Sequence, residues 1–232
     1  MSALSFRERA PAADRSEIGQ RGLLVLHHGR GTDEHDLLPL ADVLDSRRQM
    51  HVVTPRAPLA LPGSPGFHWY LVPRVGTPDP ETFQAAYEKL AALHEELWER
   101  TGIGPERTVL GGFSMGAVMS YALGLGPDRP APGGILAFSG FVPTVEGWQP
   151  DLARRQRLPV FIAHGRRDAV IDVGFAREAQ ERLKAGGLQV EYHESEAGHH
   201  IDPRELPAAG TWLDRTLPAR RRPTGEQRSA EG

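Results

Sequence analysis

Six short runs of apolar residues, separated by longer segments with helical periodicity, constrain the fold of this chain more than any other feature. The runs occupy residues 23–26, 51–53, 108–113, 134–138, 160–163 and 188–192. Continuous apolar runs of this length are typical of strands that are covered on both faces of a parallel sheet. We therefore expect a buried sheet with helices on its two sides.

The segments between these runs carry helix signals. In 81–101, apolar residues recur at steps of three and four, and Gly102 follows as a stop signal. The segment 115–125 is apolar nearly all round, which predicts a buried helix. The expected helices cover 37–46, 81–101, 115–125, 173–185 and 202–217, with Pro203 in the first turn of the last one. Alternating strands and helices predict an α/β fold with a mostly parallel central sheet flanked by helices.

A length of 232 residues allows one large domain or two small ones. We expect a single domain over 21–217, a polar N-terminal extension over 1–20 and a disordered tail over 218–232, which is rich in Arg, Gly and Ser. The segments left over are too short for a large cap domain.

Composition excludes several classes of protein. A net charge of −3 argues against a nucleic-acid binder, and the absence of Cys excludes disulfides, Cys-ligated zinc, iron–sulfur clusters and a cysteine nucleophile. Each of the two adjacent His pairs, at 27–28 and 199–200, would offer only one ligand in one direction, so we expect no metal and no cofactor. No apolar run approaches about 18 residues and no signal-peptide core is present, which predicts a cytoplasmic protein without stable membrane insertion.

The segment Gly112-Phe113-Ser114-Met115-Gly116 matches Gly-x-Ser-x-Gly between an expected strand and an expected helix. This is the context of a nucleophile elbow, in which two Gly permit a tight turn and the Ser projects from it. A Gly-rich turn with a capping Ser is the alternative. In the elbow, the Met115 amide at the helix N-terminus can face a developing oxyanion.

A serine nucleophile requires a base and a carboxylate that orients the base. On this architecture the chain order is Ser, acid, His. Asp168 follows the strand at 160–163, whereas its competitor Asp172 suits the cap of the helix at 173–185. The base follows the last strand, where either His199 or His200, after Gly198, could serve.

A second oxyanion donor should come from the loop after the first strand. This loop reads His28-Gly29-Arg30-Gly31, and its Gly residues let the backbone approach a ligand, with the Arg30 amide as the donor. A phosphate-binding turn is the alternative, but the spacing matches neither the dinucleotide nor the Walker pattern.

Together, the His-Gly-Arg-Gly loop, the Ser elbow, the His-Gly-x-x-Asp segment ending at Asp168 and the Gly-His-x-Ile segment resemble the phospholipase/carboxylesterase family of α/β-hydrolases. The resemblance covers about residues 22–217. It implies Ser114, Asp168 and His199 as the catalytic triad, with His200 as a neighbour. It also implies the amides of Arg30 and Met115 as the oxyanion hole, although the family commonly has Gln where this chain has Met115.

The resemblance implies hydrolysis of a small-molecule carboxylic ester through an acyl-enzyme, with thioesters or lysophospholipids as further substrates, by a monomer or homodimer. Two segments could wall the acyl site: the Pro-rich 54–80, with Trp69 and Leu71, and 139–159, with Phe141. They could equally cover the edge of the sheet. The alternatives for function are a ligand-binding relative without useful turnover and a dienelactone-hydrolase-like enzyme, a family that normally has Cys at the elbow.

Overall fold

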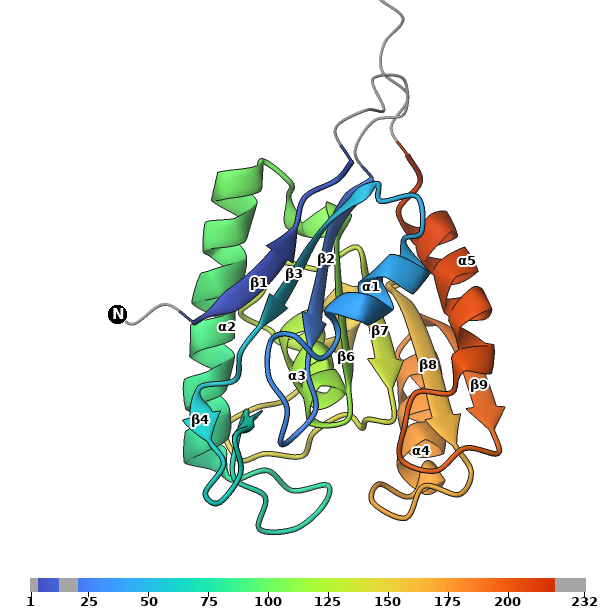
Figure 1. Ribbon diagram of the computed structural model, residues 1–232. Coiled ribbons are helices and arrows are strands. Elements are labelled where there is room, and N and C mark those ends of the chain that lie inside the picture. The colour runs from blue at the N-terminus through green and yellow to red at the C-terminus, as the bar shows by residue number, and fades with distance from the viewer. Residues whose placement is uncertain (1–3, 13–20, 220–232) are drawn as a thin grey trace, which may run out of the picture.

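The computed structural model describes residues 4–12 and 21–219, which form one seven-stranded sheet with helices on both faces (Figure 1). The spatial order is β1-β3-β2-β6-β7-β8-β9, and every neighbouring pair is parallel except β1 with β3. The expected mostly parallel sheet is therefore confirmed. Its strands are β1 (Phe6–Arg9), β2 (Gly22–His27), β3 (Met50–Pro55), β6 (Thr108–Phe113), β7 (Gly134–Phe138), β8 (Pro159–Gly165) and β9 (Gln189–Ser195).

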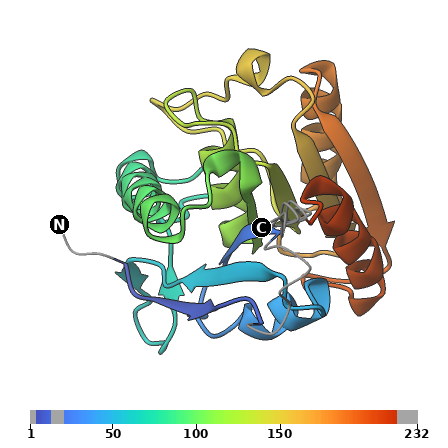
Figure 2. The ribbon, with the colours of Figure 1, turned by 90° about the horizontal axis from the view of Figure 1, so that it is seen from above.

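Within residues 4–12 and 21–219, five helices cover the sheet, and each contributes to one of two apolar cores. The helices are α1 (Leu38–Leu44), α2 (Pro80–Thr101), α3 (Met115–Leu125), α4 (Val173–Ala185) and α5 (Leu206–Thr216). Figure 2 shows α1 and α5 together on one face, with α2, α3 and α4 on the other. Because both faces are covered, β2 is buried along its whole length, which explains its uninterrupted apolar sequence.

The helix boundaries follow the local capping chemistry. Asp79 caps α2 by accepting a 2.9 Å hydrogen bond from the Thr82 amide, Pro80 opens the helix, and Gly102 ends it with a left-handed φ of 67°. Asp172 caps α4 through the Gly174 amide at 2.8 Å, as the sequence analysis expected. Helices α3 and α4 have the expected boundaries.

Two expected helices are shorter in the structure, and α1 covers Leu38–Leu44 instead of 37–46. Helix α5 begins at Leu206 instead of residue 202, because Asp202 caps a separate 3₁₀ turn, Pro203–Glu205, and Pro203 therefore lies in that turn. Within the Pro-rich segment 54–80, the short strands β4 (Leu59–Ala60) and β5 (Phe67–His68) pair with each other.

Part of the expected N-terminal extension joins the sheet. Residues Phe6–Arg9 form β1, an edge strand that pairs with β3 and that the sequence analysis did not anticipate. Residues 1–3 and 13–20 of that extension, and residues 220–232 of the expected tail, lie outside the described residues. In the described part of the chain, no helix has the length and apolar character needed to cross a bilayer.

The loops after the parallel strands gather at one end of the sheet, the lower edge in Figure 1. Helix α3 starts at this end, directly after β6, so its positive N-terminal dipole points into the space between the loops. Its opposite end is capped by the buried Arg155, which donates to the carbonyl oxygens of Gly124 at 2.7 Å and Gly126 at 2.6 Å. The C-terminal end of this helix is therefore held by a buried cation.

Candidate active site

Ser114 occupies a strained turn between β6 and α3. Its φ of 54° and ψ of −120° lie outside the common regions for a residue with a Cβ, a conformation that costs about 1–3 kcal/mol. The turn is tight because α3 presses against β2: a Cβ on Gly116 would lie 1.9 Å from the His27 carbonyl oxygen. Gly is therefore required at this position for close packing.

A chain of hydrogen bonds links Ser114 to His199 and Asp168. The Asp168 carboxylate accepts from His199 Nδ1 over 2.7 Å, which leaves Nε2 of the neutral ring as an acceptor for the Ser114 hydroxyl at 2.9 Å. The Asp168 side chain is fully buried, whereas 19% of the His199 side chain is exposed. The sequence analysis expected these three residues to act together, and the structure brings them together from three separate loops.

Asp168 is held in its charged form by several donors. Burial raises the pKa of this carboxyl, but hydrogen bonds from His199 and from the Ile171 and Val170 amides outweigh burial, and the pKa is lowered overall. The two amides lie 2.8 and 2.9 Å from Oδ1. Its competitor Asp172 caps α4 and does not contact His199 in the structure, which separates the two candidates.

A second histidine, not anticipated from the sequence, lies beside Asp168. His164 Nε2 donates to the Ile171 carbonyl oxygen at 2.8 Å and lies 3.3 Å from Asp168 Oδ2. Burial lowers the pKa of His164, so the ring is neutral at pH 7. Its position in the His-Gly-x-x-Asp segment was the available signal, and its contacts indicate that it fixes the loop that carries Asp168.

Arg30 and Met115, whose amides the sequence predicts as oxyanion donors, line the same cleft as Ser114 and His199. Neither N–H has a hydrogen-bond partner among the residues that the structure describes. The Met115 amide is one of the free donors at the N-terminus of α3. Two unpaired donors beside a serine hydroxyl can accept negative charge that develops on a substrate oxygen.

The loop that carries Arg30 is braced by the segment 54–80. His28 Nδ1 donates to the Gly29 carbonyl oxygen at 2.7 Å, and its Nε2 accepts from the Ala57 amide at 3.0 Å. Burial lowers the pKa of His28, and this arrangement requires the neutral ring. The Trp69 indole donates to the His28 carbonyl oxygen at 2.9 Å, which adds a further support.

The cleft in front of Ser114 has a volume of about 750 Å³. Leu71 and Phe141 line it, as expected for substrate-contacting residues. Trp69 does not, contrary to expectation: its side chain is fully buried and packs edge-on against His27, 5.7 Å between ring centroids. The segment 54–80 thus has two parts: residues up to Trp69 brace the loop of Arg30, although His68 among them also lines the cleft, and residues from Tyr70 to Pro78 form a cleft wall.

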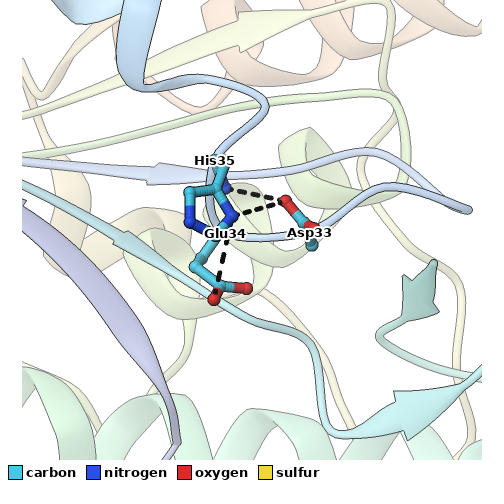
Figure 3. A group of neighbouring side chains, drawn as sticks. All are labelled: Asp33, Glu34 and His35. Atoms are coloured by element: carbon cyan, nitrogen blue, oxygen red, sulfur yellow. Dashed lines mark hydrogen bonds and ion pairs between the residues drawn. The ribbon is translucent and has the colours of Figure 1, made fainter. Parts of the chain in front are cut away.

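One group of possible metal ligands lies nearby in the described part of the chain: Asp33, Glu34 and His35, whose ligand atoms lie within 4.8 Å of one another. Figure 3 shows the His35 ring between the two carboxylates. His35 Nδ1 donates to Asp33 at 3.1 Å, and Arg56 donates twice to Glu34 at 2.6 Å. These carboxylates are already engaged by cationic or donor side chains, so the group supports no metal site.

Comparison with known proteins extends these findings. A sequence profile of the family described as Phospholipase/Carboxylesterase matches residues 13–217. The chain is 25% identical over 205 residues to acyl-protein thioesterase 1 homolog 1 of Dictyostelium discoideum, covering 84% of this chain and 90% of that protein. It is 28% identical over 220 residues to acyl-protein thioesterase 1 of Debaryomyces hansenii, covering 85% and 92%.

Among solved structures, the carboxylesterase of Bacillus cereus is similar to this chain, with a TM-score of 0.78 and 25% identity. The match covers 92% of this chain and 94% of that one. Fold and sequence likeness therefore extend over nearly the whole chain, which excludes a separate large cap among the described residues.

Proposed function

The chain belongs to the phospholipase/carboxylesterase family of α/β-hydrolases and is an ester hydrolase, and we propose that it acts through a covalent acyl-enzyme on Ser114. In this proposal His199 is the general base and Asp168 orients and stabilises its ring. The observation that carries the proposal is the continuous hydrogen-bond chain from the buried Asp168 carboxylate through His199 to the Ser114 hydroxyl.

The reaction proceeds in two balanced halves. His199 Nε2 removes the Ser114 proton while Oγ attacks the carbonyl carbon, and the resulting tetrahedral oxyanion lies against the amides of Arg30 and Met115. The intermediate collapses as protonated His199 gives its proton to the departing alcohol or thiol. Water, deprotonated by the same ring, then attacks the acyl carbon. The bond to Ser114 Oγ breaks as His199 returns the proton to Oγ, which releases the carboxylic acid and restores the free enzyme.

The oxyanion stabilisation rests on the free amides described above and on the N-terminus of α3. One such donor is worth roughly 3 kcal/mol in other enzymes. Because the α3 dipole is fixed in place before substrate binds, no reorganisation is required when the charge forms.

The substrate is an oxygen ester or a thioester whose acyl chain lies against Leu71 and Phe141 in the open cleft. The names of the relatives, acyl-protein thioesterase and carboxylesterase, support both kinds of bond. The chemistry is compatible with both because the leaving thiol needs less proton assistance than an alcohol.

A fluorophosphonate probe and a 4-nitrophenyl ester test this proposal. We expect the probe to label the wild type and not Ser114→Ala, and we expect that variant and His199→Gln to lose roughly 10⁴–10⁶-fold in kcat. His200→Gln is the matched control for the base and should remain within a few-fold of wild type. Full turnover by Ser114→Ala would overturn the proposal.

The acid is tested in the same way. Asp168→Asn keeps the shape of the side chain but no longer favours the Nδ1–H tautomer of His199, so kcat should fall by about 10⁴-fold. Asp172→Asn, which affects only the cap of α4, should retain activity and lose at most about 1 kcal/mol of stability. Equal losses of activity in the two variants would refute the assignment of Asp168.

A further inference from the structure

The cleft in front of Ser114 is positively charged within a protein of net charge −3. Arg30 and Arg74 line it, and no Asp or Glu is among its lining residues. Both arginines are exposed, and neither forms an ion pair among the described residues. The guanidinium of Arg74 donates only to the Thr77 hydroxyl, at 3.3 Å.

Most carboxylates close along the chain to this cleft are engaged by other groups, and none in the described part of the chain forms an ion pair with Arg30 or Arg74. Asp79 and Asp172 cap α2 and α4, where they accept backbone N–H groups. After Arg30, Asp33 accepts from the His35 amide and ring, Glu34 receives two hydrogen bonds from Arg56, and Asp36 accepts from the Thr32 hydroxyl. Asp168 lies behind the His199 ring and is saturated by donors. The two arginines are therefore left without a protein counter-charge at the mouth of the cleft.

The same mouth is also apolar. Of the five large hydrophobic side chains that are strongly exposed in the described residues, four line this cleft: Leu71 at 50%, Val72 at 41%, Val75 at 38% and Val170 at 56%. Exposed apolar side chains gathered around a cleft mark a ligand site more often than scattered ones do. The cleft thus offers apolar walls and two unpaired cations to one ligand.

We propose that the preferred substrate is an ester that carries an anionic group, a carboxylate or a phosphate, on an otherwise apolar body, and that Arg74 and the Arg30 guanidinium select it. This proposal rests on the hydrolase function proposed above. Guanidinium groups bind such anions through paired N–H donors, and their positive field also raises the encounter rate of anionic ligands. Neutral esters of the same length bind the walls without this contribution.

The selectivity should be moderate and dependent on salt. Exposed ion pairs contribute little each, so we expect removal of one arginine to reduce the preference for an anionic ester by about two- to fivefold. Since solvent ions screen exposed charges beyond about 10 Å at 0.1 M salt, the preference should shrink further at high ionic strength.

The experiment compares matched ester pairs. On the acyl side, mono-4-nitrophenyl adipate is compared with 4-nitrophenyl hexanoate, which has the same chain length and no charge. On the alcohol side, 4-hexanoyloxybenzoate, which carries a free carboxylate, is compared with methyl 4-hexanoyloxybenzoate, in which that carboxylate is a neutral methyl ester. The readout is the ratio of kcat/KM, anionic over neutral, in wild type, Arg74→Gln and Arg74→Glu, because the intrinsic reactivity of each ester cancels between enzymes.

In one of the two ester pairs, the one whose anion reaches the arginine, we expect the anionic-over-neutral ratio of kcat/KM to fall two- to fivefold in Arg74→Gln. In Arg74→Glu the same ratio should fall further. Arg30→Gln should lower the same ratio, whatever it does to the absolute rates. The matched control is Arg47→Gln, an exposed arginine before the start of β3, at the opposite end of the strands, and its ratio should equal that of wild type.

Two failures are distinguishable. If neutral esters are hydrolysed only when Ser114 is present but the ratio is the same in wild type, Arg74→Gln and Arg74→Glu for both arms, the selection of an anion is wrong and the hydrolase function stands. If Ser114→Ala still hydrolyses the neutral esters, the proposed function itself is wrong.

Discussion

Replacing Gly116 by Ala tests the idea that close packing of α3 on β2 positions the nucleophile. The new Cβ would lie 1.9 Å from the His27 carbonyl oxygen and 2.4 Å from its carbon, whereas Cβ contacts below 3.0 Å essentially do not occur. The start of α3 and β2 must therefore separate by about 1.1 Å. Both atoms met are backbone, so no side-chain rotation can relieve the contact.

This shift would carry Ser114 and the Met115 amide away from His199 and the Arg30 loop. A misplacement of about 1 Å can cost 10²-fold in rate, and overpacking a core costs typically 1–3 kcal/mol. We expect kcat to fall about 10²-fold and Tm to fall by roughly 2–12 °C, at about 2–4 °C per kcal/mol for a chain of this size. KM should change less, because the walls of the cleft are untouched.

Gly124→Ala, in the same helix, is the matched control. Its Cβ would meet Ile135 Cδ1 at 2.6 Å and Cγ1 at 2.8 Å, so the strain falls on side-chain atoms and not on backbone. Both substitutions gain up to about 1 kcal/mol of helix propensity. We expect this variant to keep its activity and most of its stability. Steady-state hydrolysis of a 4-nitrophenyl ester and thermal unfolding measure both variants. A Gly116→Ala enzyme with kcat within threefold of wild type and an unchanged Tm would refute the packing argument.

Two further predictions concern stability and the Arg30 loop. Burial lowers the pKa of His27 to about 3 and that of His94 well below 6.5. Below pH 6.5 the unfolded chain therefore binds protons that the native protein does not. The free energy of unfolding should then fall by up to about 1.4 kcal/mol per pH unit for each ring. Urea unfolding at pH 7.5 and 5.5 measures this fall, which should be smaller in His94→Gln, and an identical fall in that variant would contradict it. Trp69→Phe leaves the His28 carbonyl oxygen without its donor, so it should cost about 1–3 kcal/mol and lower kcat at constant KM. A raised KM with unchanged kcat would instead indicate that Trp69 contacts the substrate.

Much of this fold was readable in the sequence because its signals are local. The boundaries of α4 follow from the Asp172 cap and the Gly186-Gly187 stop, and those of α3 from the elbow before it. In contrast, β1 has only four residues and three of them are charged, so it carries no apolar run. It is a strand because β3 offers a free edge, which is a property of the assembled sheet.

The site residues also divide into those that local sequence signals predict and those that depend on tertiary packing. Residue type, chain order and position after a strand were enough to select Ser114, Asp168 and the pair His199-His200. They did not reveal that Trp69 lies beneath the Arg30 loop while Leu71, two residues later, lines the cleft. In an extended segment, side chains two residues apart point in the same direction, but the chain bends at Trp69 and Tyr70, directly after β5, so the two side chains part. Nothing in the local sequence pattern indicates that bend.

The division of the segment 54–80 also bears on how such an enzyme can change. The bracing part, through Trp69, is tied to the loop that supplies an oxyanion donor, so alterations there would damage catalysis for every substrate. The wall from Leu71 to Pro78 has largely exposed side chains and ends where Asp79 restarts regular structure. Loop exchange between relatives at these boundaries would redirect specificity while leaving the reaction chemistry intact, which makes this short stretch the natural unit of diversification.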